Sequence, residues 1–226
     1  MRTLAMILAL IMATATKAQD DLEYKMEVGG SVGLMSYQGD FNGNILSNLQ
    51  PAATLTARYK PNPRMAWAVN IKYGTLKGDY KDAENYYPGL EDNRKSFKNG
   101  TVDAGIRYEY NFWPYGTGND YRGAKRLTPF ITVGAGLTFT STKGGNVTAM
   151  NFPVGGGVKY KLGKRLNLVA EWTMHFTASD KLDHVDDPYG IKSSGVFKNK
   201  DSYSVLSAGV TYDLWAKCRT CHNDDF

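Results

Sequence analysis

Apolar and polar residues alternate along most of this chain. In residues 102–112, which read VDAGIRYEYNF, every even position is apolar or aromatic and every odd position is charged, polar or glycine. A period of two is typical of a β-strand, because successive side chains of a strand point to opposite faces of the sheet. The same pattern predicts eight strands, at residues 23–37, 52–59, 65–74, 102–112, 129–139, 152–162, 167–176 and 203–215.

The connections between these segments alternate in length. Bacterial outer-membrane barrels have an even number of strands, short periplasmic turns and longer extracellular loops. The short connections are 60–64 and 163–165, and the long ones are 38–51, 77–98, 140–150 and 177–201. The sequence therefore predicts an all-β fold, an eight-stranded antiparallel up-and-down transmembrane β-barrel with a filled lumen. Residues 113–126 form an unusually long connection on the predicted periplasmic side.

Alternation alone does not say which face points outward. A soluble lipocalin-like barrel would turn its apolar face to an internal ligand cavity and its polar face to water. Here the polar face is rich in small residues, which fit the narrow interior of an eight-stranded barrel. These are Gly29, Ser31, Gly33, Ala66, Ala68, Gly134, Gly136, Gly155 and Gly157. The small residues favour the membrane barrel, with the polar face inside.

Charged and aromatic residues support the same orientation. The charges on the polar face would have to pair across the lumen, because a buried charge needs a partner. They are Glu27, Lys72, Asp103, Arg107, Glu109, Lys159 and Glu171. Aromatic residues gather toward strand ends on the apolar face, as in a girdle at the membrane boundary. They are Tyr108, Tyr110, Phe112, Tyr160, Trp172, Tyr212 and Trp215.

The N-terminus has the features of a secretory signal peptide. An apolar run follows Arg2, and Thr16-Lys17-Ala18 places small residues at positions −3 and −1 of a cleavage site. We therefore divide the chain into a signal peptide (1–18), an outer-membrane barrel (19–215) and a periplasmic tail (216–226). Without the signal peptide, which holds Arg2, Lys17 and no acidic residue, the net charge falls from +5 to +3. The sequence has no stripe of basic residues of the kind that binds nucleic acid. We therefore expect the protein to contact membrane lipid and other proteins.

Several short stretches, spread over nearly the whole mature chain, carry a resemblance to a known family. They are Tyr37-Gln38-Gly39-Asp40-Phe41-Asn42, Gly105-Ile106-Arg107-Tyr108, Arg126-Leu127-Thr128-Pro129-Phe130-Ile131, Gly157-Val158-Lys159-Tyr160-Lys161-Leu162, Asn167-Leu168, Glu171-Trp172 and 176–185. In their order and spacing they resemble the PorG-like outer-membrane β-barrels of Bacteroidetes, the barrel component of the type IX secretion machinery. The last stretch departs from that pattern at Lys181 and His184.

This resemblance implies a structural role. Such a barrel anchors a periplasmic ring of secretion proteins, a PorK/PorN-like lipoprotein and ring subunit, to the outer membrane. The docking surface would then consist of the connection 113–126 and the tail. Aromatic and arginine side chains dominate interface energetics, so the expected contacts are Trp113, Tyr115, Tyr121 and Arg122.

The tail carries a second feature, the sequence Cys218-Arg219-Thr220-Cys221-His222. It matches the attachment motif of a c-type haem, but it ends four residues before the end of this sequence, with no helices to enclose a haem. A zinc site would need a fourth ligand from elsewhere in the chain. We therefore expect no cofactor and no metal. In an oxidising compartment, Cys218 and Cys221 would bridge each other or reach a partner chain, and the resemblance implies the second.

No set of residues indicates catalysis. His175 lies near Glu171 on the polar face, where a hydrogen-bonded lumen histidine is expected rather than a catalytic pair. The aspartates of 177–201 lack the glycine and glutamate positions of an EF-hand and predict a solvated acidic loop. No Ser-His-Asp order, nucleophile elbow or phosphate loop is present, so we expect that the protein is not an enzyme. An alternative function is a small adhesin- or porin-like barrel that acts through outer loops such as 80–95.

Overall fold

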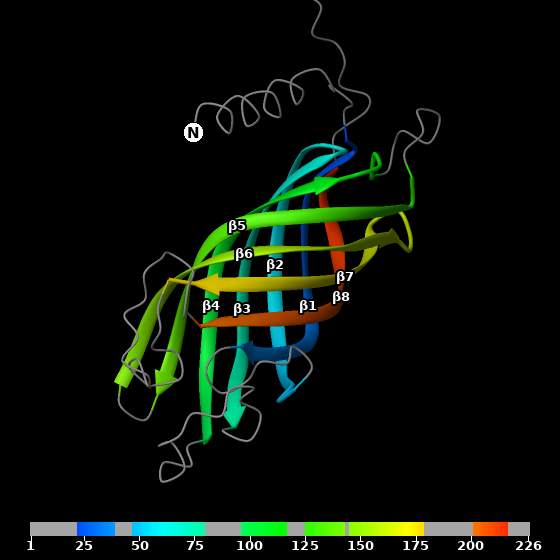
Figure 1. Cartoon of the computed structure of the whole chain (residues 1–226). Coiled ribbons are helices and arrows are strands. Elements are labelled where there is room, and N and C mark those ends of the chain that lie inside the picture. Colours follow the sequence, from blue (N-terminus) through cyan, green and yellow to red (C-terminus); the bar gives the residue numbers. More distant parts are fainter. Residues whose placement is uncertain are drawn as a thin grey trace, which may run out of the picture.

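A computed structural model of the chain confirms the predicted fold class. It describes residues 22–38, 47–79, 96–116, 125–142, 145–178 and 201–216. The eight strands are β1 (Tyr24–Gln38), β2 (Gln50–Asn62), β3 (Met65–Asp79), β4 (Ser96–Asn111), β5 (Leu127–Thr142), β6 (Gly145–Lys161), β7 (Leu166–Thr177) and β8 (Ser202–Ala216). Each strand pairs antiparallel with the next, and β1 pairs with β8 to close the barrel (Figure 1). No helix within these ranges is long and apolar enough to cross a bilayer.

The barrel has two different ends. The start of β1, the end of β8, the end of β4 and the start of β5 lie together at the upper right of Figure 1. We refer to this as the periplasmic end, because the short β2–β3 and β6–β7 turns are also there. The predicted signal peptide, Cys218, Cys221 and most of the predicted tail lie outside the described residues.

The strands extend beyond the predicted bounds at the opposite, extracellular end. β4 begins at Ser96, and β6 begins at Gly145, which pairs with Thr142 of β5. The prediction of a long loop over 140–150 is therefore wrong. Beyond the bilayer both faces of a strand meet a polar environment, so backbone pairing continues there without the apolar alternation on which the prediction rested.

The apolar face of each strand points outward, as predicted, and this excludes the soluble alternative. Val32, Leu55 and Tyr73 are 71%, 67% and 63% exposed, although they lie in the middle of regular strands. The predicted lumen charges are all buried instead. A contiguous apolar belt on a closed barrel with a charged interior is the arrangement of a membrane-spanning barrel, and bacterial barrels of this kind lie in the outer membrane. The protein is therefore an outer-membrane barrel.

The limits of the apolar belt define the membrane boundaries. On β8 the outward positions are apolar or aromatic from Leu214 to Leu206, which matches the roughly 9–11 residues a tilted strand needs to cross. The apolar run ends at the next position on this face, Ser204, which is buried and accepts a hydrogen bond from Gln38. Aromatic side chains mark the periplasmic boundary at Tyr59, Trp67, Tyr108, Tyr160 and Tyr212, and the extracellular one at Tyr73, Phe139 and Phe176. Trp172 of β7 is also exposed on this face and pairs with Leu206, the last apolar position of β8 before the extracellular boundary.

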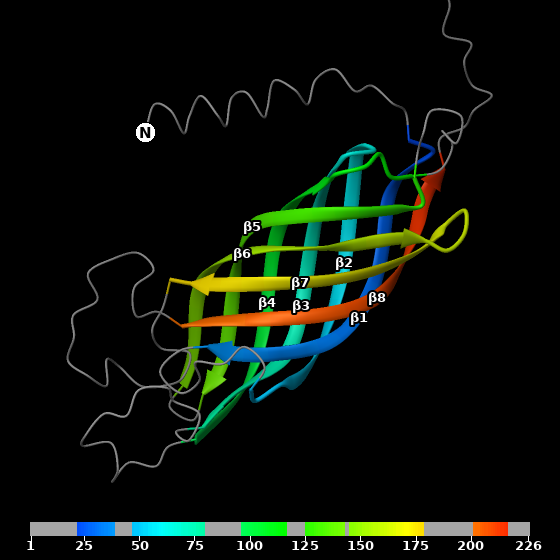
Figure 2. The same cartoon turned by 45° about the vertical axis from the view of Figure 1, so that its right-hand side comes forward.

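Inward-facing glycines allow the strands to bend sharply. A Cβ atom at Gly209 would overlap the carbonyl oxygen of Gly30 on the paired strand, and one at Gly29 would overlap that of Val210. Figure 2 shows the resulting curvature of β1, which bends along its length between β2 and β8. Glycine is required at these two positions because the two backbones approach too closely for any side chain.

Candidate functional site

The centre of the lumen is filled by a network of buried charges. Arg58 donates from Nη1 to Glu27 at 2.9 Å and from Nε to both carboxylate oxygens of Glu109 at 3.0 Å. Lys159 Nζ donates to the same Glu109 at 2.6 Å. These four side chains come from β1, β2, β4 and β6, and at most 2% of each is exposed. The network therefore joins strands across the barrel, as the predicted charge pairing requires.

A second group of charges lies toward the periplasmic end. Asp213 accepts hydrogen bonds from Lys60 at 2.5 Å and from Lys161 at 2.6 Å. Lys161 also donates to Asn167 Oδ1 at 2.9 Å. Tyr115 donates its hydroxyl to that same oxygen at 3.0 Å, and its ring lies 5.6 Å from Lys161 Nζ. Tyr115 thereby closes this end of the lumen.

A third group lies toward the extracellular end and contains the predicted lumen histidine. His175 Nε2 is 2.7 Å from Lys72 Nζ, and the imidazole stacks on Tyr203 with ring centroids 4.5 Å apart. Tyr203 donates to Asp103 at 2.8 Å. All four residues are buried, so His175 is a hydrogen-bonded residue of the lumen, as expected. Its neighbour in space is Lys72, not Glu171, which pairs with Arg107 at 3.2 Å.

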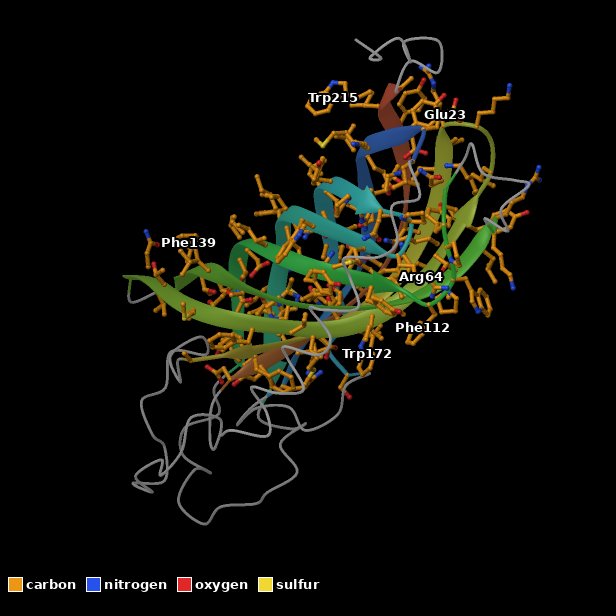
Figure 3. All side chains as sticks on the ribbon, turned by 90° about the horizontal axis from the view of Figure 1, so that it is seen from above. Glu23, Arg64, Phe112, Phe139, Trp172 and Trp215 are labelled. Carbon is orange, nitrogen blue, oxygen red and sulfur yellow. The ribbon has the colours of Figure 1, made fainter. Side chains whose placement is uncertain are left out.

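Beyond this histidine the lumen contains apolar as well as polar side chains. A cluster of buried side chains closes the extracellular end, formed by Met35, Tyr37, Ala52, Leu76, Ala149, Tyr203 and Val205. The cavity beside Arg58 and Glu171 measures only about 10 Å³, the space of about one water molecule. Figure 3, viewed from above, shows side chains throughout the barrel interior. Among the described residues the lumen is therefore filled with side chains, as predicted.

The connection after β4 is fixed to the base of the barrel by hydrogen bonds. Trp113 donates its backbone N–H to Thr128 Oγ1 at 3.1 Å, and Tyr115 donates its backbone N–H to Pro63 O at 3.1 Å. Arg64 Nη1 donates to Phe112 O at 2.8 Å, and the two residues lie side by side in Figure 3. On the far side of the connection, Lys125 donates its backbone N–H to Pro114 O at 2.9 Å. Residues 112–116 and 125–126 are therefore held in one conformation.

This fixed segment carries exposed aromatic and cationic side chains. Trp113 is 39% exposed and Phe112 is 47% exposed. Lys125 Nζ lies 4.9 Å from the centroid of the Trp113 ring, within reach of a cation–π interaction. We call Arg64, Phe112, Trp113 and Lys125 the periplasmic rim. An exposed tryptophan on a rigid base, next to cations, is the kind of surface on which protein partners dock.

The predicted contact residues have different positions. Trp113 is exposed, as a docking residue must be. Tyr115 is 1% exposed and points into the lumen, so it is not on the surface that a partner would meet; burial also raises the pKa of its hydroxyl. Tyr121, Arg122, Cys218 and Cys221 lie outside the described residues. Two rim residues, Arg64 and Lys125, were not predicted, although their place beside the predicted turns was a signal for them.

No group of three or more histidine, cysteine, aspartate or glutamate side chains among the described residues is arranged to hold a metal ion.

Comparisons with known proteins place the chain in a family. Residues 1–223 match the family described as "Domain of unknown function (DUF6089)". The chain belongs to the DUF6089 family. No curated protein matches it.

Solved structures share the fold of this DUF6089 protein. Neisserial surface protein A is 14% identical, with a TM-score of 0.55 over 84% of this chain and 97% of that one. A major outer membrane protein of Thermus thermophilus is 12% identical, with a TM-score of 0.48 over 84% and 99% of the two chains. OprG of Pseudomonas aeruginosa is 12% identical, with a TM-score of 0.47 over 88% and 100%. Only the TM-score of neisserial surface protein A is above 0.5, and at 14% identity that likeness shows the fold alone.

Proposed function

We propose that this protein is a non-conducting outer-membrane anchor that docks a periplasmic protein on its periplasmic rim. The observation that carries the proposal is Trp113, a large aromatic side chain that stays 39% exposed on a segment fixed by hydrogen bonds. Tryptophan and arginine are the residues most enriched among binding hot spots. A preformed surface also loses little conformational entropy on binding, which favours affinity.

The filled lumen supports an anchoring role over a transport role. Buried charge pairs and the apolar cluster occupy the interior from one end of the barrel to the other. Such an interior joins all the strands into one rigid body that can bear load from a bound complex. A porin-like function would need an open channel, which eight-stranded barrels with filled interiors do not have.

The resemblance to PorG-like barrels supports a specific partner for this rim. That partner is the periplasmic ring of a type IX secretion machinery, with its PorK/PorN-like lipoprotein and ring subunit. In this proposal Tyr121 and Arg122 extend the rim, and Cys218 or Cys221 forms a disulfide with the ring. The barrel then acts as the attachment point of the ring in the outer membrane and has no enzymatic role.

The test is capture of partners from detergent-solubilised envelopes of the native host, with and without reductant. The parent chain is expected to retain large periplasmic proteins, partly as an adduct that reductant releases. Trp113→Ala is expected to lose at least about tenfold of the retained partner, since hot-spot truncations cost about 2 kcal/mol or more. Phe139→Ala, which removes an equally exposed aromatic near the other end of the barrel, is the matched control.

The outcomes separate this proposal from its alternative. If Trp113→Ala retains partners as well as Phe139→Ala does, the rim is not the docking surface. If no periplasmic protein is retained and phenotypes follow deletions in 80–95 instead, the protein acts through its outer loops as an adhesin-like barrel. A Cys218→Ser, Cys221→Ser double variant with an unchanged adduct would remove the disulfide from the proposal.

A further inference from the structure

The lipid-facing wall of the barrel is hollowed on one side. The hollow measures about 610 Å³ and lies across β8, β1, β2 and β3. Small residues at Gly30, Ala53 and Ala208 leave the space, and larger apolar residues such as Val32, Leu55 and Tyr73 surround it. This volume is within the range of small-molecule sites, but here the open side faces the bilayer. We call this hollow the wall groove.

The wall groove belongs to the outer leaflet. Its β3 residues are Ile71 and Tyr73, and Tyr73 is part of the extracellular girdle. Its deepest residues, Gly30 on β1 and Val210 on β8, are paired with each other and lie near the middle of the membrane-spanning stretch. An acyl chain that enters beside Tyr73 would therefore run from the extracellular boundary to the centre of the bilayer.

Two lysines lie beyond the outer end of the wall groove. On β3 and β4, outward of the pair Tyr73 and Val102, the register places Lys77 directly opposite Lys98. Like charges directly opposite on paired strands repel each other, and among the side chains that the structure describes, which do not include that of Asp79, no carboxylate forms an ion pair with either lysine. An anion bound between them would remove this repulsion. Tyr73 and Lys77 are four residues apart on one face of β3, about 13 Å along the strand.

We propose that the wall groove and the lysine pair form one binding site for a phosphorylated, acylated lipid of the outer leaflet, of the lipid A type. The two ammonium groups bind a phosphate of the head group, and one acyl chain fills the hollow above Gly30. Basic side chains near a membrane surface attract anionic head groups, and the apolar lining suits a saturated chain. This inference is independent of the proposed docking at the periplasmic rim, which lies at the other end of the barrel.

The structure offers a substitution that fills the wall groove without straining the backbone. A Cβ atom at Gly30 would meet its nearest neighbours, Thr54 O and Leu55 Cδ2, at 3.5 and 3.6 Å, which are ordinary contact distances. The backbone therefore accepts a Cβ atom at this position, and Gly30→Leu is expected to place its side chain in the hollow. Ala135→Leu adds similar bulk to an exposed position on β5, away from the groove, and serves as the control.

The experiment measures lipid adducts on the full, refolded chain by native mass spectrometry in detergent, with diphosphoryl lipid A as the probe. The parent protein and Ala135→Leu are expected to retain one lipid A molecule. Gly30→Leu is expected to lose it, and Lys77→Ser with Lys98→Ser to weaken it about fivefold per lysine. Phosphatidylglycerol and dephosphorylated lipid A at the same concentration are expected to be retained less. Ala53→Val, with a gel-mobility check of folding, replaces Gly30→Leu if that variant does not fold.

Three results would overturn the proposal. Equal retention by Gly30→Leu and Ala135→Leu would show that the lipid does not use the wall groove. Equal retention of phosphatidylglycerol would show that head-group recognition is absent. A protein dimer that Gly30→Leu dissociates would assign the groove to a second copy of this chain.

Discussion

Glu109 is expected to be the most sensitive position of the lumen. Its carboxylate is fully buried and accepts hydrogen bonds from Arg58 and Lys159 at 3.0 and 2.6 Å. At an effective dielectric constant of about 20, each such pair contributes about 5 kcal/mol of attraction, most of which offsets desolvation. The net contribution of the pair to folding stability is therefore much smaller than the loss of stability when one partner is removed.

Glu109→Ala removes one partner and leaves the cations in place. Arg58 keeps Glu27, but Lys159 keeps only Asn111 Oδ1 at 3.2 Å and the face of Phe130. Breaking a buried pair in this way costs about 3–5 kcal/mol of folding free energy. With a denaturant slope of about 1–3 kcal/mol per molar urea, the unfolding midpoint falls by about 1–5 M.

The assay is urea unfolding of the protein in lipid vesicles, followed by tryptophan fluorescence. Glu109→Leu combined with Lys159→Met is expected to recover at least half of the loss, because it removes both charges and leaves no orphaned cation. Lys164→Ala, which removes an exposed charge in the β6–β7 turn, is expected to change stability by less than about 0.5 kcal/mol. The reasoning is refuted if Glu109→Ala is as stable as Lys164→Ala, or if the double substitution recovers nothing.

Three further predictions concern the backbone, the lumen and its periplasmic end. Gly209→Ala is expected to prevent barrel closure, because its Cβ would overlap Gly30 O, whereas Gly30→Ala is expected to fold normally. Heat-modifiable gel mobility distinguishes folded from unfolded barrels. A folded Gly209→Ala would contradict the close approach of the two backbones. The parent protein in a planar bilayer is expected to show no ion channel, because buried charge pairs and an apolar cluster fill the described part of the lumen, and discrete conductance steps would disprove this. Tyr115→Phe loses the hydrogen bond to Asn167 and is expected to cost about 0.5–1.5 kcal/mol in the urea assay; no change would show that the hydroxyl is solvated equally well.

The fold was predictable because alternate side chains of a strand in this barrel face lipid and the lumen, and the two sets differ in polarity. In β4, the segment around Ile106 and Arg107 already shows one face for lipid and one for the lumen. The small residues and charges of the polar face were sufficient to place that face inside. Where the two environments become alike, beyond the membrane, the signal disappears, and the start of β6 at Gly145 was therefore missed.

The candidate sites depended on distances that no sequence pattern contains. The sequence predicted that lumen charges would pair, but only the closed barrel decided that Arg58 bridges Glu27 and Glu109 and that His175 contacts Lys72. Partners across a lumen come from strands far apart in the chain, and their match depends on the register and stagger of all the strands together.

The sequence by itself determined the strand pattern, the orientation of the faces and the place of Trp113 after β4. The tertiary structure decided what each residue does there. Tyr115, two residues further on, turns into the lumen to reach Asn167, while Trp113 stays exposed beside Lys125. The wall groove likewise exists only because β8, β1 and β2 bring small residues together on one patch of the wall. Alternation fixes which side of a strand a residue takes, whereas its neighbours are fixed only when the barrel closes.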